Sequence, residues 1–291
     1  MEEKKKLIDL HLHTTNSDGE EDPETVIEKA KETGHAWIAI TDHNRFTFTE
    51  PQFRDGITVL PGNEFSSTYY VPAWKRTAEI HIVGIFPNGV KEEEFEEIRS
   101  EIGKGKEAYV AAILEDLKTR GIFITLDEVY AVERKTQYIG RHQIARILVD
   151  RGLEPDMEAA FDHQVGNFSP YYIPSTDYIS FAPMDVIIKK IRDCGGIPCL
   201  AHPFGYSMEE AEIEQLIWDF KEAAGEVAAM EVYYEMYLDN PAKMDFLHRM
   251  QEKYQLLPSA ASDRHRVDQP FTTDGGEQLL EAMMEALKKE R

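Results

Sequence analysis

The chain has 291 residues, of which 42% are hydrophobic and 30% are charged. This length fits one large domain, or one domain with a modest insertion, and the composition excludes a disordered chain. The 54 acidic residues outnumber the 32 basic ones, and the formal net charge of -22 argues against broad electrostatic binding to nucleic acid or to an anionic membrane. A phosphate substrate remains compatible with this charge, because bound cations invert the local field.

Membrane and disulfide-rich classes are also excluded. No apolar stretch approaches the ~20 residues that a membrane span needs, and the first residues contain no apolar signal core. The two cysteines, Cys194 and Cys199, rule out a disulfide framework and are interpreted as reduced structural residues. We therefore expect a soluble, cytoplasmic protein without a membrane partner.

Short apolar runs alternate with amphipathic segments along most of the chain. Seven runs are predicted to be β-strands, namely Leu7–Leu12, Trp37–Thr41, Ile57–Leu60, Ile80–Phe86, Ile197–Ala201, Ala228–Tyr233 and Leu257–Ala261. Helical patterns such as Pro23–Thr33 and Met184–Asp193 lie between several of them and end near a glycine. This alternation indicates a parallel α/β architecture. Seven runs favour a closed barrel of about seven strands, with an open sheet as the alternative.

The middle of the chain departs from this alternation. From residue 92 to residue 166 the pattern is almost wholly helical and charged, and only Ile122–Thr125 looks extended. We interpret this stretch as a helical insertion domain, called the lid below. The predicted barrel is then discontinuous and consists of residues 1–91 and 167–291.

The first strand carries two histidines in a pattern that is typical of metal binding. Side chains alternate faces along a strand, so His11 and His13 point the same way and can hold one ion or bridge two. The alternative is a pair of polar residues on an exposed strand. That alternative is hard to reconcile with Ile8, Leu10 and Leu12, which pack the other side. We therefore favour metal binding at this strand.

Residues that bind metals recur near the ends of other predicted strands. In a parallel barrel the active site is built from the loops at the C-terminal ends of the strands. Together with the first pair, the candidates are six histidines and three carboxylates: His11, His13, Asp18, His43, Glu64, His81, His202, Asp263 and His265. So many such positions are not expected of polar residues that merely satisfy a core.

The kind and number of these candidates indicate which metals bind. A set without thiolates suits Zn, Mn or Fe better than Ca. Nine ligands exceed the needs of one ion and suit two or three divalent ions, with open positions for water and substrate. Asp9 and Asp42 are interpreted as acceptors that orient neighbouring histidines. Glu231 also lies near the expected barrel mouth and is left without a role.

The order of these motifs resembles the PHP family, named for polymerase and histidinol phosphatase. The motifs are HxHT, SDG, TDHN, PGxE, a strand histidine, AHP and SDxH, and they span nearly the whole chain in the family's order. The resemblance implies a distorted (β/α)7 barrel, similar to a TIM barrel, with two or three metal ions at its C-terminal mouth. It also implies that the nine candidates are the metal ligands.

The lid resembles one branch of this family more closely. The stretches GRHQIARILVDRG and CGGIPCLAHP are similar to those of small phosphoesterases with a helical lid, in which an arginine and a histidine face the substrate phosphate. Arg141 matches the arginine. Gln143 stands where the family has its histidine, and His142 lies one residue earlier. We predict that Arg141 and His142 bind phosphate, with Gln143 as the alternative for the second contact.

These inferences predict an enzyme that hydrolyses a phosphomonoester by attack of a metal-bridging hydroxide. The resemblance implies a small nucleotide substrate, such as a nucleoside bisphosphate, or the 5′ end of a short oligonucleotide, and no extended binding of nucleic acid. Histidinol-phosphate phosphatase is one alternative. A non-catalytic metal-binding interaction domain is another, although such domains often lose ligands and all nine positions are filled here.

Overall fold

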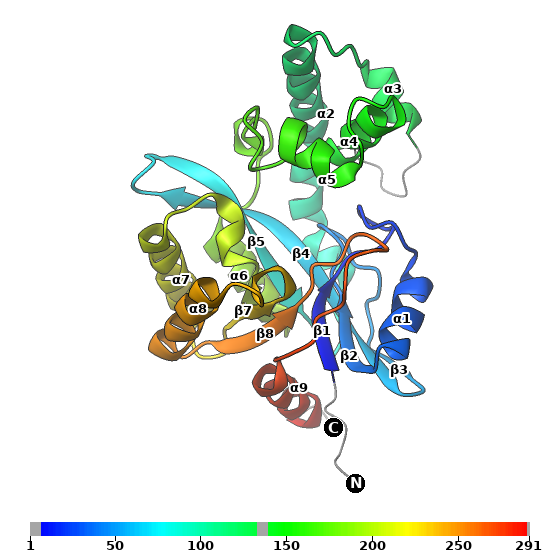
Figure 1. Ribbon diagram of the computed structural model, residues 1–291. Helices are drawn as coiled ribbons and strands as arrows, with labels where there is room; N and C mark the ends of the chain where they lie inside the picture. Colours follow the sequence, from blue (N-terminus) through cyan, green and yellow to red (C-terminus); the bar gives the residue numbers. More distant parts are fainter. Residues whose placement is uncertain (1–6, 133–138, 290–291) are drawn as a thin grey trace.

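The computed structural model describes residues 7–132 and 139–289. Its main strands form one sheet that curls into a nearly closed barrel, in the order β1-β2-β4-β5-β6-β7-β8 (Figure 1). The strands are β1 (Leu7–Leu12), β2 (His35–Ile40), β4 (Ile57–Val71), β5 (Arg76–Ile85), β6 (Ile197–Leu200), β7 (Ala229–Tyr234) and β8 (Leu257–Ala261). The short β3 (Gln52–Arg54) pairs with β4. Each predicted run overlaps one strand of the barrel, although β4 and β5 are longer than predicted, and the predicted fold class is confirmed.

The barrel closes where β1 lies beside the segment that follows β8. The backbone N–H of Asp263 donates to the carbonyl of His11 at 2.9 Å, and that of His13 donates to the carbonyl of Arg264 at 3.1 Å. A parallel bridge joins Leu12 and Arg264 at the same place. Two segments that are far apart in sequence and rich in candidate ligands therefore lie side by side.

One strand runs against the expected direction. β5 is antiparallel to both of its neighbours, β4 and β6, whereas the sequence pattern predicted a parallel sheet. The reason is the connection, because only residues 72–75 join β4 to β5 and a parallel pair needs a crossover of about a dozen residues or more. The two strands instead form a long hairpin, with Val71 opposite Arg76.

Helices cover the outside of the barrel, as the alternation predicted. They are α1 (Pro23–Glu32), α6 (Met184–Asp193), α7 (Glu210–Ala224), α8 (Pro241–Tyr254) and α9 (Glu277–Lys289). In α1, the side chain of Asp22 caps the first turn by accepting from the backbone of Thr25, and Val26, Ile27 and Ala30 are buried at helical spacing. α9 lies at the end of the barrel opposite the lid (Figure 1).

The lid is built from helices that share a hydrophobic core of their own. η1 (Glu92–Phe95) leads into them, but its Phe95 packs in the core of the barrel. The helices around the lid core are α2 (Glu96–Thr119), α3 (Leu126–Ala131), α4 (Arg141–Asp150), α5 (Met157–Ala160) and the π-helical turn η2 (Phe161–Val165). That core also contains Ile179 and Phe181, which follow the expected end of the insertion at residue 166. The division of the chain into a barrel and an insertion stays a prediction.

The segment Ile122–Thr125 does not form a strand, contrary to its extended sequence pattern. It is an unpaired connection between α2 and α3. Thr125 is the N-cap of α3, where its hydroxyl accepts from the backbone N–H of Glu128, so the chain is extended there in order to begin a helix. Within the described ranges, no helix is both long enough and apolar enough to cross a membrane.

Candidate metal centre and substrate cleft

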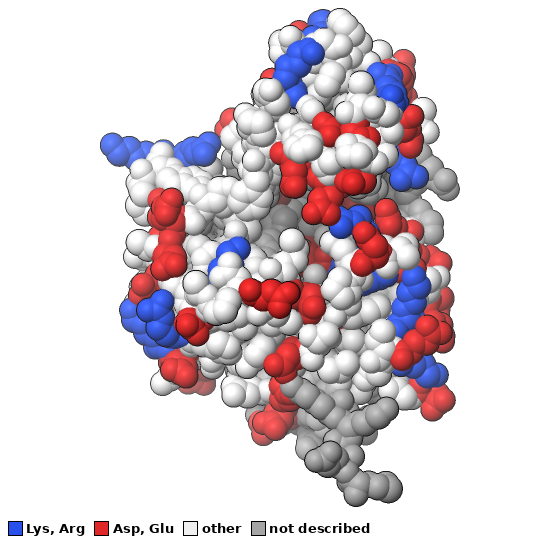
Figure 2. All heavy atoms as spheres, viewed as in Figure 1, with Lys and Arg blue, Asp and Glu red and all other residues white. Residues whose placement is uncertain are grey.

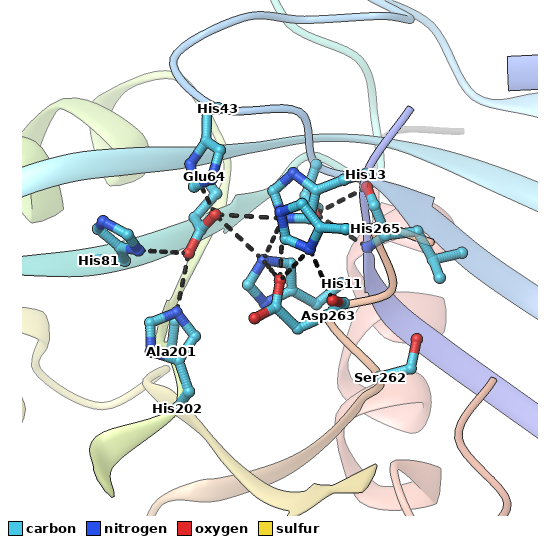
Figure 3. A network of polar contacts seen from close by, with 12 residues as sticks. His11, His13, His43, Glu64, His81, Ala201, His202, Ser262, Asp263 and His265 are labelled. Atoms are coloured by element: carbon cyan, nitrogen blue, oxygen red, sulfur yellow. Dashed lines mark hydrogen bonds and ion pairs between the residues drawn. The ribbon is translucent and has the colours of Figure 1, made fainter. Parts of the chain in front are cut away.

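All nine candidate ligands converge at the mouth of the barrel, and Figure 3 shows most of them directed toward one another. His11 lies on β1, Glu64 on β4 and His81 on β5, while His202 and Asp263 are each the second residue after β6 and β8. The barrel thus gathers residues whose positions in the sequence span about 250 residues, as expected for a site at strand ends.

Three overlapping sets of side chains have the spacing of metal sites. Within each set, one possible ligand atom from every residue lies within 4.8 Å of the others. The sets are His11, His13, Glu64 and Asp263; then His13, Asp18, His43 and His265; then His43, Glu64 and His81. Because the sets share members, the ion positions that they define are adjacent, as in sites where several ions act on one substrate.

Glu64 stands at the centre of the cluster and is 1% exposed. Its Oε1 atom lies 2.7 Å from His81 Nδ1 and 2.9 Å from His202 Nε2. Its Oε2 atom lies 2.8–3.3 Å from ring nitrogens of His11, His13 and His43. Burial alone would raise the pKa of the Glu64 carboxyl, but the surrounding imidazoles, His43 foremost, hold it well below its ordinary value.

Several buried atoms of the cluster lack a hydrogen-bond partner among the residues that the structure describes. They include Asp18 Oδ1, Glu64 Oε2, His81 Nδ1 and Asp263 Oδ1, which approach their neighbours without the alignment of a hydrogen bond. A buried polar atom left in this state costs about 1–3 kcal/mol. Divalent cations satisfy carboxylate oxygens and imidazole nitrogens together, so the residues present fit a group of such ions.

Glu231 on β7 orients one of the candidate ligands, a role that the sequence did not reveal. Its Oε1 atom lies 2.6 Å from His11 Nδ1, and its Oε2 atom accepts from the backbone N–H of His202 at 2.6 Å. The second nitrogen of His11, Nε2, therefore faces the cluster. The available signal was an acidic residue inside the otherwise apolar run AMEVYY.

In the part of the chain that the structure describes, neither Asp9 nor Asp42 hydrogen-bonds directly to an imidazole ring, contrary to that interpretation. Asp9 accepts from the backbone N–H groups of Ser262 at 3.0 Å and Thr272 at 3.1 Å. Asp42 accepts from the backbone and hydroxyl of Thr14, both at 2.8 Å. Both carboxylates instead fix the loops that carry candidate ligands, because short polar side chains readily bind neighbouring backbone groups.

Two candidate ligands have an unusual backbone conformation. His202 has φ +25° and Asp263 has φ +51°. Left-handed values are uncommon outside glycine and often mark a sharp change of chain direction. Here they occur two residues after β6 and β8 end, where the chain turns away from the barrel and the side chain has to reach back to the cluster.

A cleft of about 610 Å³ lies between the barrel mouth and the lid. The barrel contributes cluster residues to its wall, including Asp18, His43 and His81, and the lid contributes Arg141 and His142. Figure 2 shows this face hollowed below the lid, with acidic side chains around the hollow. The volume lies in the usual range for small-molecule sites.

Arg141 and Gln143, both in the first turn of α4, make different hydrogen bonds. Arg141 Nη1 donates to Asn167 Oδ1 at 2.7 Å and to the carbonyl of Val165 at 3.3 Å, which holds the side chain beside the cleft. Gln143 is 7% exposed, and its Oε1 atom accepts from the backbone N–H of Gly140 at 2.8 Å. Gln143 therefore stabilises the first turn of its own helix.

The His142 imidazole interacts electrostatically with residues of the cluster, including Asp18 and His265. Burial lowers the pKa of its imidazole below the ordinary value, against the opposing effect of the nearby Asp18 carboxylate. Lys106 on α2 is a further cation in the cleft wall that the sequence did not reveal. Among the described residues, no side chain forms a hydrogen bond or an ion pair with Lys106. The lid therefore faces the cluster with Arg141, His142 and Lys106.

Fold and site together define an α/β barrel protein whose mouth carries a carboxylate–imidazole cluster suited to divalent cations. Comparison with known proteins agrees. The PHP domain family matches residues 9–122. The chain is similar to the 3′,5′-nucleoside bisphosphate phosphatase of Chromobacterium violaceum, with 29% identity over 89% of this chain and 87% of that protein. It is also similar to the 5′-3′ exoribonuclease Rnm of Escherichia coli, with 27% identity over 89% and 85%.

Solved structures share the fold along almost the whole chain. An amidohydrolase from Chromobacterium violaceum, solved with bound sulfate and no metal, has a TM-score of 0.75 and 25% identity, with 96% of each chain covered. A protein from Bifidobacterium adolescentis has a TM-score of 0.71 and 21% identity, again with 96% of each chain covered. The resemblance of this chain to the PHP family, predicted from its motifs, is confirmed.

Proposed function

We propose that the protein is a metal-dependent phosphoesterase that removes the phosphate of a small nucleotide, such as a nucleoside bisphosphate or the 5′ end of a short oligonucleotide. One observation carries the proposal above all: Asp18, His43 and His81 of the cluster line a cleft whose opposite wall presents Arg141. Cations on one side and a guanidinium on the other suit a phosphate group between them.

The chain's own residues have separable roles in this reaction. The nine candidates would hold two or three divalent ions. Eight of them form the three metal-type sets, in two of which Glu64 takes part, and His202 joins them only through its contact with Glu64. Glu231 orients His11. Such ions supply positive charge to phosphate oxygens and lower the pKa of a bound water. Arg141 grips the oxygens that face the lid, because its planar fork matches phosphate. The lid covers one side of the cleft, and the lower polarity there strengthens these interactions.

A nucleotide is the proposed substrate for two reasons. The cleft has apolar side chains beside the charged ones, including Ile102, Ile139 and Phe161, which suit a base or ribose better than a charged leaving group. The relatives reported above are named for nucleotide or RNA substrates. They give the histidinol phosphatase alternative no support. We propose the same class of substrate for this chain, with short rather than long oligonucleotides because of its net charge of -22.

A phosphate-release assay tests the proposal. Metal-stripped protein is reloaded with Mn, Zn or Fe and offered a nucleoside 3′,5′-bisphosphate, a 5′-phosphorylated short oligoribonucleotide and histidinol phosphate. We expect the highest kcat/KM with one of the two nucleotide substrates and none without metal. A preference for histidinol phosphate would reject the substrate class, and tight metal binding without turnover of any substrate would favour the non-catalytic alternative.

The second lid contact is predicted to be His142 rather than Gln143. His142→Ala should lower kcat/KM about tenfold, the usual scale of a lost hydrogen bond to a charged group, with little change in thermal stability. Gln143→Ala should lower stability by about 1 kcal/mol, because the capping contact with Gly140 is lost, and should leave kcat/KM close to wild type. Kinetics and thermal denaturation of both variants check this, and the reverse pattern would assign the contact to Gln143.

A further inference from the structure

Glu79 on β5 contacts one of the candidate metal ligands from the side away from the cluster. It precedes His81 by two residues, so the two side chains leave the same face of the strand. Glu79 Oε1 lies 3.5 Å from His81 Nε2, while His81 Nδ1 lies 2.7 Å from Glu64 Oε1. The imidazole is therefore placed between two carboxylates, one on each ring nitrogen.

This placement decides which nitrogen can bind a cation. A neutral imidazole has one N–H group and one free lone pair. Because an ionised carboxylate only accepts hydrogen bonds, Glu79 favours the N–H on Nε2 and leaves the lone pair on Nδ1, which faces Glu64. Histidines that bind metals usually donate their other N–H to a carboxylate or carbonyl in this way.

His11, on the other side of Glu64, has the same arrangement of two carboxylates, but the roles of its two ring nitrogens are exchanged. There Glu231 contacts Nδ1, and Nε2 faces Glu64 at 3.3 Å. Glu64 is thus flanked by two imidazoles that are each held by a further carboxylate. His81 differs because its nitrogen toward the cluster, Nδ1, lacks any aligned hydrogen bond and is buried.

Glu79 is itself held by the segment that returns from the lid. The hydroxyl of Ser175, in the turn η3 (Ser175–Asp177), donates to Glu79 Oε2, and Ser175 is 3% exposed. Two residues earlier, the carbonyl of Ile173 accepts from the hydroxyl of Tyr109 on α2 at 3.0 Å. Contacts therefore run from the long lid helix through the return segment to Glu79 and His81.

We propose that Glu79 is a positioning residue, which fixes His81 with Nδ1 toward the ion position shared by Glu64, and that Ser175 ties this residue to the lid. The inference rests on the proposed function only in taking His81 as a metal ligand. It adds a residue that acts through its contact with His81, although Glu79 also lines the cleft. Its consequence is that the packing of the return segment influences how tightly one ion of the cluster is held.

Metal titration of the stripped protein tests this role without reference to turnover. Glu79→Ala is expected to raise the Kd of one Mn²⁺ or Zn²⁺ ion about 10- to 100-fold, with the other ions bound as in wild type. Glu79→Gln keeps an acceptor oxygen and should restore most of the affinity. Ser175→Ala should weaken the same ion by a smaller factor, because Glu79 remains but loses its tether. Co²⁺ absorption should change at that ion alone.

The control is Glu94→Ala, which removes the same charge from an exposed glutamate that pairs with Lys190 and has no contact with the cluster. It should bind every ion as wild type does. Wild-type affinity for all ions in both Glu79 variants would overturn the proposal, even if turnover fell. Conversely, a weakened ion in a protein that hydrolyses no phosphate ester would support the role of Glu79 and reject the proposed function.

Discussion

Glu64→Ala is expected to remove almost all phosphoesterase activity and at least one bound ion per chain. Glu64 contacts five imidazoles, and two of the three metal-type sets include it. Mutation of a residue that only orients a metal ligand usually lowers metal affinity or activity about 10- to 100-fold. Loss of Glu64, which is itself a shared candidate ligand, should therefore lower kcat/KM by more than about a hundredfold. Elemental analysis and the phosphate-release assay measure the two effects.

A matched variant separates this effect from a general loss of charged residues. His163 is exposed and pairs with Glu154 on the lid, away from the cluster. His163→Ala should therefore keep the metal content and the kcat/KM of the wild type. Normal metal content and turnover in Glu64→Ala would mean that the active site lies elsewhere, even though the histidines converge here.

Arg141→Ala is expected to lower kcat/KM about ten- to a hundredfold, because charge-assisted hydrogen bonds of this kind contribute roughly 1.5–3 kcal/mol. Arg141→Lys keeps the charge but loses the planar fork, so it should be impaired by a smaller factor. Metal content should not change in either variant, since Arg141 is outside the three sets of candidate ligands. Kinetics on the best substrate, with elemental analysis, measure these outcomes.

Arg146→Ala is the matched control for this prediction. Arg146 lies on the same helix, is exposed and pairs with Asp150 one turn later. Its removal should leave kcat/KM unchanged. Because Arg141 also donates to Asn167 and to the backbone of Val165, thermal denaturation is needed to detect a loosened lid. Wild-type kcat/KM in Arg141→Ala would show that the lid does not contact the phosphate.

The strands and the candidate ligands were accessible to sequence reasoning for a physical reason. Buried strands are short and apolar, so runs such as Leu7–Leu12 are visible without a structure, and β1 has those bounds. Residues such as His202 and Asp263 directly follow such runs, and strand ends meet at one side of a barrel. Their convergence therefore followed from the fold. Their roles as ligands remain a prediction that metal analysis has to test.

Other features depend on contacts between distant segments, which local patterns do not encode. The reversed direction of β5 follows from a connection of only four residues, and the sequence pattern did not show that β4 extends to Val71. Glu231, Glu79 and Lys106 were not assigned, because an acidic or basic residue in a strand or helix gives no sign of what it will face. The different surroundings of His142 and Gln143 likewise depend on how α4 begins.

At His202 and Asp263 the left-handed backbone conformation lowers the stability of the fold, while the side chains are candidate metal ligands. A residue other than glycine held in this region costs on the order of 1–3 kcal/mol, although aspartate and histidine occur there more often than most other residues. Glycine at either position would relieve that cost and delete a candidate ligand in the same step. Selection for heat resistance alone would therefore tend to erode the cluster, and the barrel keeps these two residues at the expense of its own stability.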